Sequence, residues 1–215
     1  MGTQEFIKSA NRKLAPKVVK NLQARHFDAY FCETADEALE KAIELIDKNG
    51  TVAWGGTMTA TEIGLLDRLK NDGYNCIDRN SAKTEEERIE LMQKAVFSDT
   101  FIMSSNAVSY DGQLVNIDGF GNRVCAMIYG AKSVVMVVGM NKVMPTLEDA
   151  ITRARTVAAP RNMQRFSGKN TPCAVCGSCG DCVSEDSICC HEVITRVGRP
   201  AGRIKVILVN EELGL

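Results

Sequence analysis

The chain has 215 residues, which is enough for one domain with a sizeable core but short for two full domains. Hydrophobic residues make up 45% and charged residues 25%, as in ordinary globular proteins, and the net charge of −1 excludes a large basic surface for nucleic acid. Residues 1–20 carry charges throughout, and no apolar run approaches the roughly 20 residues of a membrane span. We therefore expect a cytoplasmic protein without membrane insertion.

The first half of the chain alternates between amphipathic helices and short apolar strands. Residues 3–25 show the helical spacing of apolar side chains, and Pro16 is a candidate break in this helix. Capping boxes that begin at Thr34, Thr59 and Thr84 predict the starts of three further helices. The strands expected between these helices are residues 29–32, 51–54, 75–78 and 100–104.

The second half continues this alternation. Asp111-Gly112 lies between two apolar runs, residues 108–110 and 113–117, and predicts a hairpin. Because strands that alternate with helices form βαβ units, we expect an α/β fold with a mostly parallel sheet flanked by helices, in a single domain over residues 1–215. The remaining expected elements are helices over residues 124–129 and 147–158 and strands over residues 133–138, 192–197 and 204–209.

Residues 160–190 are rich in Gly, Ser, Asn and Cys and are therefore expected to form a loop. Its cysteine-rich part covers residues 171–191. Cysteines spaced two residues apart can face one cation, and a bound metal would offset the entropy lost in ordering a segment that has little apolar surface. We therefore expect a four-thiolate site that holds zinc or an iron–sulfur cluster. Unligated or disulfide-paired cysteines on a mobile loop are the alternative. The clustered cysteines are Cys173, Cys176, Cys179, Cys182, Cys189 and Cys190.

A glycine turn joins the strand at 51–54 to the next helix and is a candidate anion site. Gly55, Gly56 and Thr57 are placed at the carboxyl end of a strand beside a helix N-terminus, and Thr59 follows. Anions bind at such positions in α/β sheets because backbone N–H groups and the helix dipole favour negative charge. The turn lacks the Gly-Lys-Ser/Thr ending of a phosphate-binding Walker loop, and a purely structural turn is the alternative.

A second polar turn follows the strand at 113–117. Asn116, Asp118, Gly119, Asn122 and Arg123 bring two carboxamides, a carboxylate and a guanidinium to one strand end. Asp118 is a candidate general base, and Arg123 is a candidate clamp for a carboxylate or phosphate. The alternative is an Asx turn with an Asp118–Arg123 ion pair. A dinucleotide fingerprint is rejected because its third glycine is missing.

Three further residues follow predicted strands and are candidates for the same cleft. Ser104 and Asn106 would line it as substrate-binding residues, and Lys142 would reach into it as a catalytic residue. A surface position is the alternative for Lys142.

Together these motifs resemble the lactate-utilisation (LUD) domain family. The resemblance covers nearly the whole chain and is strongest over residues 104–161, which include the Asn116-Ile-Asp-Gly run and Val137-Val-Gly-Met-Asn-Lys142. It implies a Rossmann-like sheet of the kind found in ribose-phosphate isomerases, glucosamine-phosphate deaminases and CoA transferases, with a cleft at the strand ends. The Gly55-Gly56-Thr57 turn is similar to the phosphate-cradling turn of those enzymes.

The resemblance also implies a role in an iron–sulfur system that oxidises lactate to pyruvate. The family's cysteine pattern falls on Cys173, Cys179, Cys182 and Cys189, which leaves Cys176 and Cys190 as alternates. The ferredoxin-like segment of the larger family members is missing, so electron transfer would need iron–sulfur partner subunits.

Other functions stay open at this point, including whether the chain is itself an enzyme. The substrate would be a small anion: a hydroxy acid, a sugar phosphate or an acyl-CoA. One rival is an isomerase-like or CoA-transferase-like enzyme with a structural zinc. The other is a binding module that senses redox or metal state. A homodimer is a further expectation.

Overall fold

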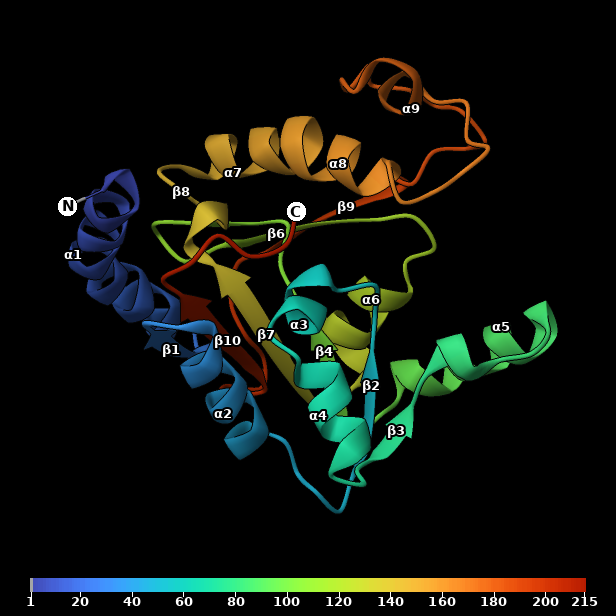
Figure 1. Ribbon diagram of the computed structural model, residues 1–215, viewed down its shortest axis with the longest axis horizontal. Helices are drawn as coiled ribbons and strands as arrows, with labels where there is room; N and C mark the ends of the chain where they lie inside the picture. Colours follow the sequence, from blue (N-terminus) through green and yellow to red (C-terminus); the bar gives the residue numbers. More distant parts are fainter. Residues whose placement is uncertain (1) are drawn as a thin grey trace.

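Residues 2–215, which a computed structural model describes, form two sheets and the helices that cover them (Figure 1). In the main sheet every strand pairs in parallel with its neighbours, so all the carboxyl ends lie at one edge. This confirms the predicted α/β fold with a parallel sheet. In spatial order the strands are β1 (Asp28–Cys32), β10 (Ile204–Val209), β7 (Ser133–Gly139), β4 (Thr100–Met103), β2 (Thr51–Trp54) and β3 (Asn75–Ile77).

Helices cover both faces of the main sheet because successive side chains of each strand point to opposite faces. In β7, Val135 and Val137 pack into the core on one face, while Val134, Met136 and Val138 pack into the core on the other. The first face is covered by α2 (Ala35–Leu45), α3 (Met58–Glu62) and α4 (Leu65–Asn71). The second is covered by α1 (Thr3–Ala24), α5 (Glu85–Val96), α6 (Asn122–Cys125) and the π-turn Ala126–Gly130.

The smaller sheet lies above the carboxyl ends of the main strands (Figure 1). Its central pair is the predicted hairpin, closed by a hydrogen bond of 2.8 Å from Gly112 N to Ser109 O. Its strands are β8 (Val143–Met144), β5 (Ala107–Ser109), β6 (Leu114–Asp118) and β9 (His191–Thr195). The helical layer over it consists of α7 (Leu147–Arg153), the π-turn Ala154–Ala158 and α8 (Ala159–Met163).

Two predicted helices of the first half differ from the structure. The N-terminal helix α1 continues through Pro16 without a break. The helix after β2 is capped by Thr57, whose side chain accepts a hydrogen bond from Ala60 N, and not by Thr59. It also divides at Gly64, whose φ of +74° ends α3 and starts α4. The predicted capping box at Thr59 was therefore wrong, and its hydroxyl is left for another contact.

The segment expected to be a loop from residue 160 is partly helical. Helix α7 runs on through the π-turn into α8, because Pro160 occupies the first turn of α8, where its missing N–H costs little. A short helix α9 (Pro172–Cys176), capped by Thr171, carries the first two clustered cysteines. No helix that residues 2–215 form is long and apolar enough to cross a membrane.

Candidate active site

Three residues that follow three different strands meet at the carboxyl edge of the main sheet. Lys142 ends the 3₁₀ turn Met140–Lys142 after β7, Ser104 follows β4, and Thr59 lies in the first turn of α3 after β2. The Nζ of Lys142 donates to Thr59 Oγ1 at 3.0 Å and to Ser104 Oγ at 3.2 Å. The two hydroxyl oxygens are 3.4 Å apart. The structure thus unites three predicted site residues and rejects the surface position for Lys142, which is 3% exposed.

The environment of Lys142 favours its neutral form. Burial, and secondarily the charge of Arg153, lowers the pKa of Lys142 to about 7, while Glu62 acts in the opposite direction. Both hydrogen-bond partners of the amine are hydroxyl groups, and these stabilise the ammonium form less than a carboxylate would. An amine of this kind can accept a proton or attack a carbonyl near neutral pH.

The C-terminal residues 211–215, here called the covering segment, close this site. Leu213 N donates to Asn141 Oδ1 at 3.2 Å, and Gly214 N donates to Glu62 Oε2 at 2.6 Å. A Cβ atom on Gly214 would lie 2.8 Å from Lys142 Nζ and would overlap the hydroxyl of Thr59. The backbone of Gly214 therefore lies directly against the amine.

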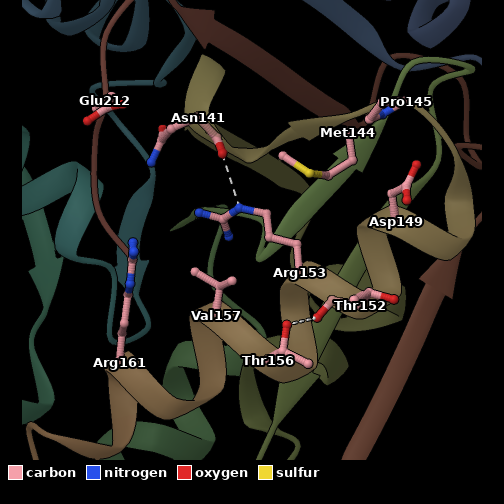
Figure 2. A pocket seen from close by; sticks show the side chains of 10 residues that line it. All are labelled: Asn141, Met144, Pro145, Asp149, Thr152, Arg153, Thr156, Val157, Arg161 and Glu212. Atoms are coloured by element: carbon pink, nitrogen blue, oxygen red, sulfur yellow. Dashed lines mark hydrogen bonds between the residues drawn. The ribbon is translucent and has the colours of Figure 1, made fainter. Parts of the chain in front are cut away.

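A groove of about 610 Å³ is lined by Arg153, Arg161 and Glu212, among others (Figure 2). Arg153 crosses it and donates to Asn141 O at 3.1 Å and to Asn106 O at 2.5 Å. Burial, and then the charge of Arg161, lowers the pKa of Arg153 to about 10. Glu212 of the covering segment lines the groove, while Gly214 of the same segment lies against Lys142.

The two predicted polar turns also lie together. A Cβ atom on Gly55 would be 2.5 Å from the Cδ of Arg123, so the arginine stem passes directly over the glycine turn. Arg123 Nε is 3.1 Å from Asp118 Oδ2, and Asp118 Oδ1 accepts a hydrogen bond from Gly121 N at 3.1 Å. Both the ion pair and the Asx-type turn are therefore present. The catalytic roles of Asp118 and Arg123 stay predictions.

Four other predicted binding residues contact the second sheet or its surroundings. Asn106 Oδ1 accepts a hydrogen bond from Ile117 N at 2.9 Å, which ties the two ends of the hairpin. Asn116 is fully buried with its amide 3.7 Å from Met127 Sδ, and within residues 2–215 its Oδ1 has no hydrogen-bond partner. Gly119 packs against the backbone of Ile188, and Asn122 opens α6.

Sequence reasoning did not single out Arg79 and Arg165, which face the glycine turn. A Cβ atom on Gly56 would lie 3.3 Å from Arg79 Nη2 and 3.6 Å from Arg165 Nη1. One signal was available for Arg79, because it follows the strand β3 and so belongs to the same sheet edge as Gly56. Arg165 follows α8 and is brought here only by the tertiary fold.

We predict that Gly55→Ala lowers the free energy of unfolding by about 1–3 kcal/mol, because the new methyl group overlaps the Arg123 stem. In an Arg123→Ala background the same substitution should cost much less, since the overlapping Cγ and Cδ atoms are gone. Urea unfolding of the four proteins in this double-mutant cycle measures the difference. Equal costs in both backgrounds would show that the contact is absent in solution.

The cysteine cluster gathers around Cys189. Burial and then the thiols of Cys173, Cys179, Cys182 and Cys190 raise the pKa of Cys189 to about 11. Cys190 Sγ also lies 3.6 Å from Ser187 O. Three of these four neighbours are the other members of the predicted ligand set, and the fourth is the alternate Cys190.

The donor set fits zinc or an iron–sulfur cluster in its chemistry, since it consists of thiols alone. Cys176 is not among the thiols that perturb Cys189 and contacts Ser178 O at 3.8 Å. The thiols lie in one region but do not surround a common point. Within residues 2–215 no three Cys, His, Asp or Glu side chains stand in a metal-ligating arrangement. All nine cysteines are free thiols.

The chain resembles known proteins in both sequence and fold. The family model of the LUD domain matches residues 15–209. A DUF162 family protein from Deinococcus radiodurans is 11% identical and superposes with a TM-score of 0.55, covering 93% of this chain and 98% of that chain. Ribose 5-phosphate isomerase A from Neisseria gonorrhoeae is 18% identical with a TM-score of 0.34, covering 65% and 70%. The likeness to the DUF162 family protein shows the fold alone. No curated protein matches the chain.

Proposed function

Since the chain belongs to the LUD-domain family, we propose that it is an enzyme that acts on a small anionic substrate, as a subunit of a system oxidising lactate or a related 2-hydroxy acid. The observation that carries the catalytic part is the buried amine of Lys142, held by Thr59 and Ser104 at the carboxyl edge of the sheet. The substrate class rests on what the family resemblance implies.

In this proposal Lys142 takes the hydroxyl proton of the substrate. Oxidation of a 2-hydroxy acid to a 2-oxo acid removes two protons and two electrons: the O–H proton goes to the amine, and the Cα–H bond breaks with its proton and both electrons passing to an external oxidant, which in the assay below is the artificial electron acceptor. A neutral amine is suited to this step because it accepts a proton without first losing one. Thr59 and Ser104 orient the amine, and Arg123, which pairs with Asp118, would bind the carboxylate of the substrate.

The residues proposed to hold a metal centre are Cys173, Cys179, Cys182 and Cys189, with Cys176 and Cys190 as alternates. When bound there, an iron–sulfur cluster would supply electron acceptance toward partner subunits, whereas zinc would act only as a structural staple. The presence of Cys173, Cys179 and Cys182 among the neighbours of Cys189 supports the first four as the set, and the presence of Cys190 there keeps it as an alternate.

We predict that the protein, purified without oxygen, binds D- or L-lactate and that the Lys142→Met variant loses turnover by a factor on the order of 10²–10⁴. Thermal shift measures binding, because a ligand stabilises the folded state by mass action. Turnover is followed with an artificial electron acceptor, and iron, sulfide and zinc are assayed in the same sample. Lys20→Met, at an exposed lysine, is the matched control. Binding and turnover of neither enantiomer would remove lactate as the substrate.

A second candidate is an isomerase-like or CoA-transferase-like enzyme with a structural zinc. The observation that favours it is the group of arginines around Gly56, which exceeds what a monocarboxylate requires. Zinc without iron or sulfide in the purified protein, together with binding of a phosphorylated compound, would support this candidate over lactate oxidation.

A further inference from the structure

The groove of Figure 2 contains two guanidinium groups. Arg153 comes from the end of α7 and Arg161 from α8, and they are here called the arginine pair. Figure 2 shows the guanidinium group of Arg153 directed toward the side of the groove on which Arg161 stands. Burial is the main cause of the lowered pKa of Arg153, and the charge of Arg161 is the next, so the two groups are close enough to repel each other.

Neither member of the arginine pair has a carboxylate partner within residues 2–215. Arg153 is 6% exposed and donates only to backbone carbonyl groups, from Nε to Asn141 at 3.1 Å and from Nη1 to Asn106 at 2.5 Å and Leu215 at 3.4 Å. Its Nη2 makes no hydrogen bond to any of the described residues. The side chain of Arg161 is exposed and forms no ion pair or hydrogen bond with them. A buried cation in this situation costs free energy, which a bound anion would offset.

Two carboxylates line the groove but do not neutralise the arginine pair. Asp149 accepts hydrogen bonds from the backbone and hydroxyl of Thr146 at 3.2 and 2.9 Å, and in Figure 2 it lies on the opposite side of Arg153 from Arg161. Glu212 is exposed, and its charge is not among those that perturb Arg153. Both carboxylates would repel a doubly charged ligand such as a phosphate monoester, so a single negative charge fits the groove best.

The other side chains that line the groove indicate what the anion carries. Met144, Pro145 and Val157 provide apolar surface, and the volume of about 610 Å³ is in the range of small-molecule sites. A planar carboxylate has two oxygens, which matches one guanidinium group on each side. The groove therefore suits a carboxylate at its arginine pair and an aliphatic chain along its apolar wall.

We propose that this groove is a binding site for a small monocarboxylate with an aliphatic chain, whose carboxylate bridges Arg153 and Arg161. Of the described residues, those that line the groove include none that hold the amine of Lys142 and none of the Gly55-Gly56-Thr57 turn. The ligand is therefore not the substrate but a second molecule, bound beside the candidate active site.

Occupation of the groove would act on Lys142 through Arg153. After burial, the charge of Arg153 is the next cause that lowers the pKa of Lys142, and the charge of Glu62 opposes it. A carboxylate paired with Arg153 offsets its charge, so the pKa of Lys142 rises and more of the amine is protonated near pH 7. The ligand would thus inhibit a reaction that needs the neutral amine. Only this inhibition rests on the proposed function; binding in the groove does not.

Isothermal titration of the full chain with acetate, butyrate, hexanoate and hexanol tests the proposal. We expect affinity to rise about fourfold for each added CH₂ group of the carboxylates, and hexanol, which has no charge, to bind at least about tenfold more weakly than hexanoate. Arg161→Gln, at an exposed position, should weaken hexanoate binding about tenfold or more. Arg196→Gln removes the same charge from an exposed arginine elsewhere and should change the affinity by less than about twofold.

The effect on the amine is measured by repeating the hexanoate titration between pH 6 and 9. Arg153, with a pKa of about 10, stays largely charged in this range, whereas Lys142, with a pKa of about 7, loses its proton. Because coupling is reciprocal, the affinity of the wild type should fall as the pH rises, and that of Lys142→Met should stay nearly constant. Equal pH dependence in both proteins would overturn the effect on Lys142.

The outcomes separate this site from the proposed function. Hexanoate binding that is lost in Arg161→Gln supports the site, even if lactate is never turned over. Lactate turnover that persists in Arg161→Gln also supports it, because the groove is then not where the substrate binds. Absence of hexanoate binding, equal binding of hexanol and hexanoate, tighter binding of inorganic phosphate than of hexanoate, or wild-type affinity in Arg161→Gln overturns the proposal.

Discussion

Lys142→Met is expected to stabilise the protein at pH 7 and to remove a rise in stability toward alkaline pH. The pKa of Lys142 is about 7 in the folded chain against 10.5 for an unperturbed lysine. Between these values the unfolded chain binds a proton that the folded chain does not, so the free energy of unfolding rises with pH through this window. At about 1.4 kcal/mol per pKa unit, the full rise is on the order of 5 kcal/mol. Methionine fills a similar volume and carries no charge.

Urea unfolding at pH 7, 8, 9 and 10 measures this difference. Other groups also titrate in this range, so the informative quantity is the gap between the wild-type and variant curves, which should narrow as the pH rises. Lys20→Met, at an exposed position, should stay parallel to the wild type. Parallel curves for Lys142→Met as well would show that the amine is not buried in its neutral form.

Gly214→Val is expected to displace the covering segment from Lys142. Any side chain at this position meets Lys142 Nζ and Thr59, and the φ of +65° is strained for valine. Displacement should let water reach the amine and return the pKa of Lys142 toward its ordinary value. The rise in stability between pH 7 and 10 should therefore shrink, and the amides of Leu213 and Gly214 should exchange at least about tenfold faster.

Glu212→Val provides the matched control, because this exposed side chain lies on the same segment but lines the groove of Figure 2. It should leave both the pH dependence and the amide exchange near their wild-type values. If Gly214→Val also left them unchanged, the covering segment would not be what closes the site.

The sequence predicted the sheet well because its signals are local. Each parallel strand is a short apolar run, and the hairpin depends on Asp111-Gly112, two adjacent residues with a specific backbone geometry. The positions of Gly55, Ser104 and Lys142 followed from the same pattern, since residues after parallel strands gather at one edge. These residues lie near one another because their strands are parallel neighbours in the sheet.

The parts that could not be predicted depend on longer-range or competing contacts. Thr59 is followed by Glu62 in a capping-box pattern and Thr57 is not, yet the structure shows that Thr57 caps α3 while Thr59 binds Lys142. The covering segment is held over the amine by a hydrogen bond from Gly214 N to Glu62, two residues that are 152 positions apart in the sequence. Nothing in the local pattern near Gly214 distinguishes it from an ordinary surface residue.

The cysteine loop and the Asp118 turn are joined by a short strand pairing. Strand β9 begins at His191, directly after Cys190, and His191 pairs with Asp118 in the ladder between β6 and β9. Gly119 also lies against Ile188 within the same loop. A ligand that orders the loop therefore restrains Asp118 and, through its ion pair, Arg123. Because coupling between binding free energies is reciprocal, an anion held by Arg123 would strengthen the binding of metal to the loop by the same factor by which the metal strengthens the binding of the anion.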